Sequence, residues 1–148
     1  MIDDPVLVDD WHPVCRSAEL AEGGLFSARL LQEALVLWRQ QDQIMAWQDL
    51  CLHRAARLSH GRVGKPGAVC PYHGWVYNGA GRCSHIPAHP EQIPPAKAQV
   101  RTYQAQERYG LVWVCLGEPT SELHLRSDRT AIAYRRWLAQ LGLTFGAA

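Results

Sequence analysis

Short apolar stretches separated by turn residues occupy most of the chain. Strands are expected at Trp11–Val14, Phe26–Leu31, Ala34–Trp38, Ile44–Trp47, Val100–Glu107 and Leu111–Leu116. Ala34–Trp38 and Leu111–Leu116 are apolar throughout, which is typical of strands covered on both faces. Val100–Glu107 instead alternates, with Tyr103 and Ala105 on one face. Short strands punctuated by turn signals predict an all-β fold, either a sandwich or a barrel.

Glycine, proline and polar residues mark where these strands end. Gln40–Gln43 is a polar turn, and Asn78–Gly81 has the composition of a hairpin turn. Gly61–Gly67 contains three Gly and one Pro, which predicts turns rather than a helix. Four prolines between Ile86 and Pro95 predict an extended or irregular connector to the next strand.

The end of the chain has a different pattern. One apolar stripe at helical spacing runs through Ala131, Tyr134, Leu138 and Leu141. Ser127 or Asp128 can cap this helix, and Gly142 ends it. We therefore expect a β domain over residues 1–119 and a tail over residues 120–148 that holds one amphipathic helix.

Composition excludes several classes of partner. A length of 148 residues suits one domain, and a formal charge of +1 gives no reason to expect nucleic acid or an anionic membrane. No apolar run approaches the roughly 20 residues that span a bilayer. The N-terminus is acidic and lacks a basic start followed by an apolar stretch, so no export signal is expected. These features predict a soluble, cytoplasmic protein.

Two short blocks each offer one thiolate and one imidazole. The first is Cys51-Leu52-His53, and sixteen residues later comes Cys70-Pro71-Tyr72-His73-Gly74-Trp75. A [2Fe-2S] cluster with mixed ligation needs two Cys on one iron and two His on the other. A structural zinc site also takes two Cys and two His, although zinc spacing more often groups both Cys in one knuckle. Zinc therefore stays open as an alternative.

These two blocks together resemble a Rieske [2Fe-2S] domain. The sequence of these blocks and their surroundings is similar to the N-terminal part of the large subunit of Rieske non-haem iron oxygenases, the ring-hydroxylating and O-demethylating enzymes. The resemblance extends from Trp11–Val14 to Gly110–Gly117. It implies an antiparallel β-sandwich in residues 1–119 with a cluster-binding subdomain at about residues 49–84. It also implies that Cys51 and Cys70 hold the inner iron, and His53 and His73 the outer iron.

The resemblance implies a function in electron transfer. Such a domain takes single electrons from a reductase or ferredoxin and passes them to a mononuclear non-haem iron on a catalytic domain or subunit, which this chain lacks. The chain alone is expected to carry electron transfer only, with no catalytic residues, and it can belong to a homo-oligomer. Two other classes remain: a free-standing Rieske ferredoxin and a zinc-stabilised binding module.

The resemblance also indicates the redox potential. High-potential Rieske proteins of respiratory complexes carry an extra Cys in each loop, where this chain has Ala56 and Tyr72, so their disulfide cannot form. Trp75 replaces a Ser that would donate to a cluster sulfur, while Tyr77 keeps the other donor position. Fewer hydrogen bonds stabilise the reduced state less, which predicts a potential around −150 mV.

Other residues of metal-binding type have simpler interpretations. Five Cys is an odd count, which argues against a full disulfide framework. Cys115 lies in an apolar run and is expected to be buried, and Cys15 and Cys83 are expected to be unligated thiols. His85, His89 and Glu91 have the residue types of a mononuclear iron site, but Pro87 and Pro90 prevent one helix from presenting them together.

Overall fold

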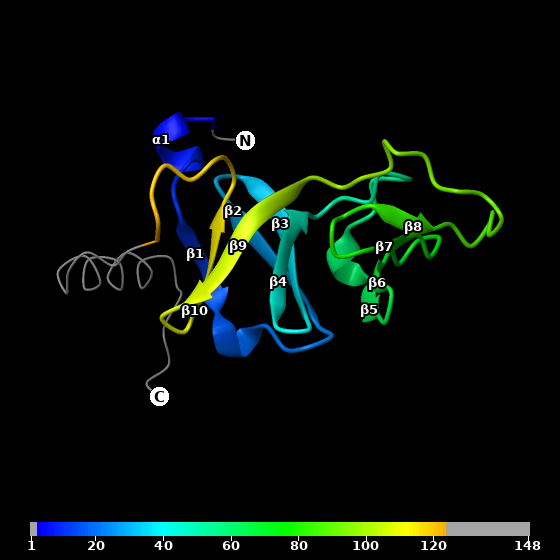
Figure 1. Ribbon diagram of the computed structural model, residues 1–148, viewed down its shortest axis with the longest axis horizontal. Helices are drawn as coiled ribbons and strands as arrows, with labels where there is room; N and C mark the ends of the chain where they lie inside the picture. The colour runs from blue at the N-terminus through cyan, green and yellow to red at the C-terminus, as the bar shows by residue number, and fades with distance from the viewer. Residues whose placement is uncertain (1–2, 124–148) are drawn as a thin grey trace.

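Two antiparallel sheets make up most of the described structure. The computed structural model describes residues 3–123. Figure 1 shows the larger sheet in the middle of the molecule and the smaller one at the end opposite α1 (Pro5–Val8). The larger sheet has the strand order β1 (His12–Arg16), β10 (Leu111–Cys115), β9 (Thr102–Arg108), β4 (Gln43–Gln48), β3 (Glu33–Gln40), β2 (Leu25–Leu30). The smaller sheet has the order β5 (Arg62–Gly64), β6 (Gly67–Val69), β7 (Val76–Tyr77), β8 (Cys83–His85).

Helical structure is scarce in the described residues. Besides α1 it consists of the 3-10 turns η1 (Ser17–Glu19) and η2 (Leu58–His60). The prediction of an all-β antiparallel fold is confirmed. The amphipathic helix predicted in the tail lies outside the described residues.

Two-residue turns connect the neighbouring strands of the larger sheet. Gln41 and Asp42 join β3 to β4, and both have positive φ, +52° and +62°. Leu31 and Gln32 join β2 to β3 in the same way, with φ of +48° and +69°. Two consecutive left-handed residues define a type I′ turn, whose twist matches that of the paired strands. The polar turn predicted at Gln40–Gln43 is confirmed, whereas Leu31 belongs to a turn and not to the strand predicted to include it.

Strand β3 is buried on both of its faces. Leu35 and Leu37 enter one core together with Val112 and Val114 of β10. The alternate side chains Val36 and Trp38 enter a second core, which also contains Trp47, Cys51, Cys70 and Tyr77. Because β-strand side chains alternate between faces, one continuous apolar run serves both cores. The second core is the one that carries the Cys blocks.

The structure adds one element and corrects one detail of the sequence interpretation. Val6–Val8 lies in α1, which the sequence did not predict, and Asp4 caps this helix because its Oδ1 accepts a hydrogen bond from the Val6 amide at 3.0 Å. Gly61–Gly67 is not made of turns alone, because it contains β5 and the start of β6. A Cβ on Gly67 would lie 1.9 Å from the carbonyl oxygen of Tyr77, so only glycine allows β6 to approach β7 there.

The proline-rich connector has no helix or strand between Ile86 and Pro95, as predicted. In Figure 1 it leaves the smaller sheet at the far end of the molecule and returns to β9. Ile86, Ala98 and Val100 anchor it by entering the second core. The connector therefore ties the smaller sheet to the larger one.

Candidate metal centre

The two Cys blocks form loops with the same hydrogen-bonding pattern. In the first loop the Cys51 amide donates to the Ala56 carbonyl at 2.7 Å, and the Ala55 amide donates to the Cys51 carbonyl at 2.8 Å. In the second, the Cys70 amide donates to the Trp75 carbonyl at 2.8 Å, and the Gly74 amide donates to the Cys70 carbonyl at 3.2 Å. Each loop therefore closes with the residues four and five positions after its cysteine.

Each closed turn also contains one left-handed residue, at the same offset from the cysteine. Ala55 has φ of +53° and Gly74 has φ of +71°. This conformation brings the chain back to the level of the cysteine within five residues. The residues between, which include the histidine of each block, are left at the tip of the loop.

The loops place the cysteines inside and the histidines outside. Cys51 and Cys70 are 1% and 2% exposed and lie in the second core. His53 is half-buried and His73 is exposed, and their Nδ1 atoms lie 3.0 Å apart. The four residues singled out from the sequence are thus brought together as a thiol pair and an imidazole pair.

The thiol pair lies in a protected environment. Burial raises the pKa of Cys70, and the neighbouring Cys51 thiol adds to the rise. The backbone amides of Tyr72 and His73 donate to the Cys70 sulfur and oppose this rise in its pKa. A metal bound here would have to displace the thiol protons, and the two amides would then stabilise the resulting thiolate.

The imidazole pair is held by aromatic neighbours. The His53 ring stacks on Trp75 with centroids 4.6 Å apart and planes 16° apart, and Tyr72 lies against His73 with centroids 4.1 Å apart. Desolvation lowers the pKa of His53, and the nearby His73 and Arg54 lower it further. A neutral imidazole is the form that binds metal, so this environment favours ligation.

One buried carboxylate beneath the first loop was missed in the sequence. Asp49 is 4% exposed and accepts hydrogen bonds from the Ser59 amide at 2.8 Å and the Ser59 hydroxyl at 2.6 Å. Arg57 lies 3.9 Å from the same carboxylate. A single Asp between an apolar strand and the first Cys block was the available signal. The Asp49 carboxylate holds Ser59, and so fixes the end of the loop that follows His53.

The geometry fits a two-metal cluster better than a single ion. Among residues 3–123, no group of three or more His, Cys, Asp or Glu side chains converges on one metal position. This applies to the four residues of the two loops and equally to His85, His89 and Glu91. Two nitrogens 3.0 Å apart can still share one ion, since metal–histidine bonds are about 2.0–2.1 Å long. A pair of nitrogens and a separate pair of sulfurs is the donor set of a mixed-ligand [2Fe-2S] cluster.

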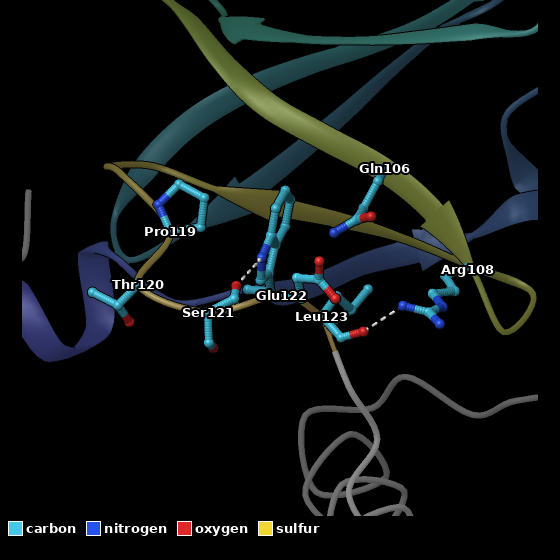
Figure 2. Close-up of a pocket in the computed structure, with 8 residues that line it drawn as sticks. Gln106, Arg108, Pro119, Thr120, Ser121, Glu122 and Leu123 are labelled. Atoms are coloured by element: carbon cyan, nitrogen blue, oxygen red, sulfur yellow. Dashed lines mark hydrogen bonds between the residues drawn. The ribbon is translucent and has the colours of Figure 1, made fainter.

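A separate depression lies away from the two loops. Its volume is about 630 Å³, and it is bounded by Trp11, β9 and the segment after β10. Figure 2 shows Gln106 and Arg108 facing Pro119–Leu123, with the Arg108 guanidinium donating to the Leu123 carbonyl at 2.6 Å. Among residues 3–123, no His or Cys lines this depression, so these residues offer none of the ligands found in the two loops.

An antiparallel β fold with buried thiols beneath outward imidazoles is typical of an iron–sulfur domain with mixed ligation. Comparison with known families agrees, since residues 10–104 match the family model described as Rieske [2Fe-2S] domain. The chain belongs to this family, and its cofactor is a Rieske-type [2Fe-2S] cluster.

Known relatives share the family but are much longer. The chain is 42% identical over 111 residues to methylxanthine N1-demethylase NdmA of Pseudomonas putida, covering 72% of this chain and 32% of that protein. It is 36% identical over 117 residues to oxidoreductase NdmD of Pseudomonas putida, covering 78% of this chain and 20% of that protein. A solved structure of NdmA from Pseudomonas putida CBB5 superposes with a TM-score of 0.73 at 37% identity, covering 83% of this chain and 40% of that one.

The chain thus spans about a third of the length of NdmA, and less of NdmD. Within residues 3–123, no helix is long and apolar enough to cross a membrane.

Proposed function

We propose that Cys51 and Cys70 bind one iron of the Rieske cluster and that His53 and His73 bind the other. The observation that carries this proposal is the pairing of the donors, with the His53 and His73 Nδ1 atoms 3.0 Å apart and the two thiols buried in one core. The matching turns of the two loops support it, because each buries its cysteine and leaves its histidine at the loop tip.

When bound, the cluster accepts and donates one electron at a time. The residues around it decide how it is held and where the electron enters and leaves. The buried thiols keep water from the inner side, while the imidazoles lie where a partner can approach within electron-transfer distance. The Tyr77 hydroxyl lies 3.3 Å from the Cys51 sulfur, where it would donate a hydrogen bond to a cluster-bound thiolate and so favour the reduced state.

The proposed role is relay rather than chemistry on a substrate. A reductase or ferredoxin supplies single electrons, and the cluster passes them to a mononuclear non-haem iron on a catalytic domain or subunit, within a homo-oligomer. The similarity to NdmA, whose name is that of a demethylase, supports this role. A cytoplasmic location stays a prediction from the sequence.

A free-standing electron carrier is the second candidate. The similarity to NdmD, which is named an oxidoreductase, supports considering it, because a matching domain then also occurs in a protein that is not named a demethylase. Reconstitution separates the two: turnover that depends on this chain when it is mixed with a reductase and a catalytic domain supports the oxygenase role. Electron transfer through this chain from the reductase to a haem acceptor, without such turnover, supports the carrier.

Anaerobic purification with spectroscopy tests the ligand set. We expect two iron and two acid-labile sulfides per chain, and a rhombic EPR signal of low average g after reduction with dithionite. The variants Cys70→Ser and His73→Ala should lose the iron and sulfide, and with them the EPR signal. The controls Cys115→Ser and His85→Ala change a buried thiol and an exposed imidazole outside the loops, and they should keep both. One zinc per chain without sulfide would contradict the proposal and restore the zinc-stabilised module.

A further inference from the structure

Charge is divided sharply along the chain. Between residues 50 and 90 there are five Arg and Lys and no Asp or Glu, although the whole chain has 15 basic and 14 acidic residues. Asp49, just before this range, is a carboxylate that the structure shows bonded to it, and it is buried and paired with Ser59 and Arg57. Figure 1 places the smaller sheet and α1 at opposite ends of the molecule, and Asp3, Asp4, Asp9 and Asp10 are in or beside α1. Among residues 3–123, the part that bears the cluster loops is therefore rich in positive charge, whereas the segment around α1 is acidic.

Basic side chains lie close to the loop tips. Arg54 directly follows His53 in the first loop, and its charge acts on that imidazole. Arg62 lines a cavity of about 320 Å³ together with Cys70, Pro71 and Gly74 of the second loop. Arg54 therefore lies in the first loop, and Arg62 lies beside the second.

These charges are exposed and mostly uncompensated. Of the five basic residues between positions 50 and 90, Arg57 forms an ion pair with Asp49. Within the described part of the chain the other four have no carboxylate within ion-pair distance, and all four are exposed: Arg54, Arg62, Lys65 and Arg82. Their field therefore extends into solvent.

An exposed apolar centre lies within this positive surface. Leu52 and Tyr72 are 44% and 58% exposed, and they are sequence neighbours of His53 and His73. Exposed apolar side chains surrounded by charge are typical of a docking surface, in which the apolar centre excludes water and the charges guide the approach. Here that centre coincides with the imidazoles from which an electron would enter or leave.

We propose that this surface, defined by Leu52, Arg54, Arg62 and Tyr72, docks an acidic electron-donor protein. The inference rests on the proposed function, since it assigns a partner to the same site. A phosphate polymer would meet the same cations, but it has no use for an apolar centre over the imidazoles. An acidic [2Fe-2S] ferredoxin fits both features, and transfer is balanced: the donor cluster loses one electron and the Rieske cluster gains it.

Stopped-flow kinetics with an acidic plant-type [2Fe-2S] ferredoxin tests the proposal. The rate constant for reduction of the 148-residue protein should fall at least tenfold between 20 and 300 mM NaCl, since salt screens exposed charges. Arg54→Glu combined with Arg62→Glu should slow reduction about tenfold at low salt. Arg29→Glu, an exposed reversal on β2, should leave the rate unchanged. A rate indifferent to salt and to both arginines would overturn the proposal, as would an equal loss in Arg29→Glu.

Two further measurements keep the outcomes distinct. An EPR spectrum unchanged in the charge variants shows that an altered rate comes from docking and not from damage to the cluster. NMR titration with redox-inert, gallium-substituted ferredoxin reports binding independently of electron transfer, and we expect shifts at residues 52–54 and 72–74. If wild-type protein lacks a cluster but still binds ferredoxin at these residues, the proposed ligand set is rejected and the docking surface is not. Tighter binding of a DNA duplex than of ferredoxin would overturn the acidic-protein partner.

Discussion

The hydroxyl of Tyr77 lies 3.3 Å from the sulfur of Cys51, and both side chains are buried in the core that joins the two sheets. Tyr77 is on β7 of the smaller sheet, whereas Cys51 begins the loop after β4 of the larger one. Burial raises the pKa of Tyr77, and the Cys51 thiol raises it further. Tyr77 therefore keeps its proton and can donate it to a cluster-bound sulfur.

Replacing Tyr77 by Phe should lower the reduction potential. A hydrogen bond worth about 1 kcal/mol corresponds to roughly 40 mV for one electron, and it stabilises the reduced cluster more because the sulfur then carries more negative charge. Redox titration followed by EPR measures the shift relative to the unmodified protein, whose predicted potential is about −150 mV. Tyr109→Phe, in an exposed turn, is the matched control and should leave the potential unchanged. A Tyr77→Phe potential equal to the parent value would show that this bond does not tune the cluster.

The left-handed residues of the two loops should respond in opposite directions. Ala55 adopts φ of +53°, which costs a residue with a Cβ about 1 kcal/mol, so Ala55→Gly should be neutral or stabilising by up to that amount. Gly74→Ala should be destabilising by at least as much, because φ is +71° and the new Cβ would lie 3.2 Å from Pro87. Thermal unfolding of the two variants checks this, and a loss of stability in Ala55→Gly would contradict the shared turn geometry.

The strands and the ligand blocks could be read from the sequence for different reasons. Strand β3 was predictable because five consecutive apolar residues must be covered on both faces, and the structure divides Leu35–Trp38 between two cores. The Cys and His of each block were predictable because their residue types and spacing carry the chemistry. Neither signal depends on contacts between distant parts of the chain.

Features that depend on distant contacts were not predictable. That His53 and His73 come together was implied by the resemblance, but their 3.0 Å distance and the stacking of His53 on Trp75 depend on how two separate loops pack against each other. Gly67 permits β6 to pair closely with β7, a role that its local sequence does not distinguish from an ordinary turn. α1 is only four residues long and was missed, because no helical periodicity can be recognised in so short a segment.

An ion pair on the larger sheet should make stability depend on pH. The hydrogen bond from Arg39 lowers the pKa of Glu107, and the charge of Arg39 adds to this effect. A lowered pKa in the folded state stabilises the fold above the ordinary value of 4.5, and this contribution is lost as the pH falls through the folded value. Because Glu107 is 39% exposed, solvent screening keeps the gain below about 1 kcal/mol.

Glu107→Gln should therefore unfold at a lower temperature than the parent at pH 6, and the difference should shrink toward pH 3. Comparing the two proteins at each pH cancels the effect of acid on the cluster. Glu91→Gln changes an exposed carboxylate of the connector and should show no such difference. If the difference in unfolding temperature between the parent and Glu107→Gln stays constant from pH 6 to pH 3, the carboxylate contributes by packing and not by charge.

Asp49 should connect the stability of the fold to retention of the cluster. Asp49→Ala leaves the half-buried amide and hydroxyl of Ser59 without their acceptor, which should cost about 2 kcal/mol. Ser59→Ala removes only the hydroxyl bond and should cost about 1 kcal/mol, so the two variants form a graded series. Because Asp49 and Ser59 hold the two ends of the segment that bears Cys51 and His53, iron loss during repeated reduction and air oxidation should follow the same order. Equal iron content in both variants and the parent would show that the contact between Asp49 and Ser59 does not affect retention of the cluster, even if the unfolding temperatures fall as expected.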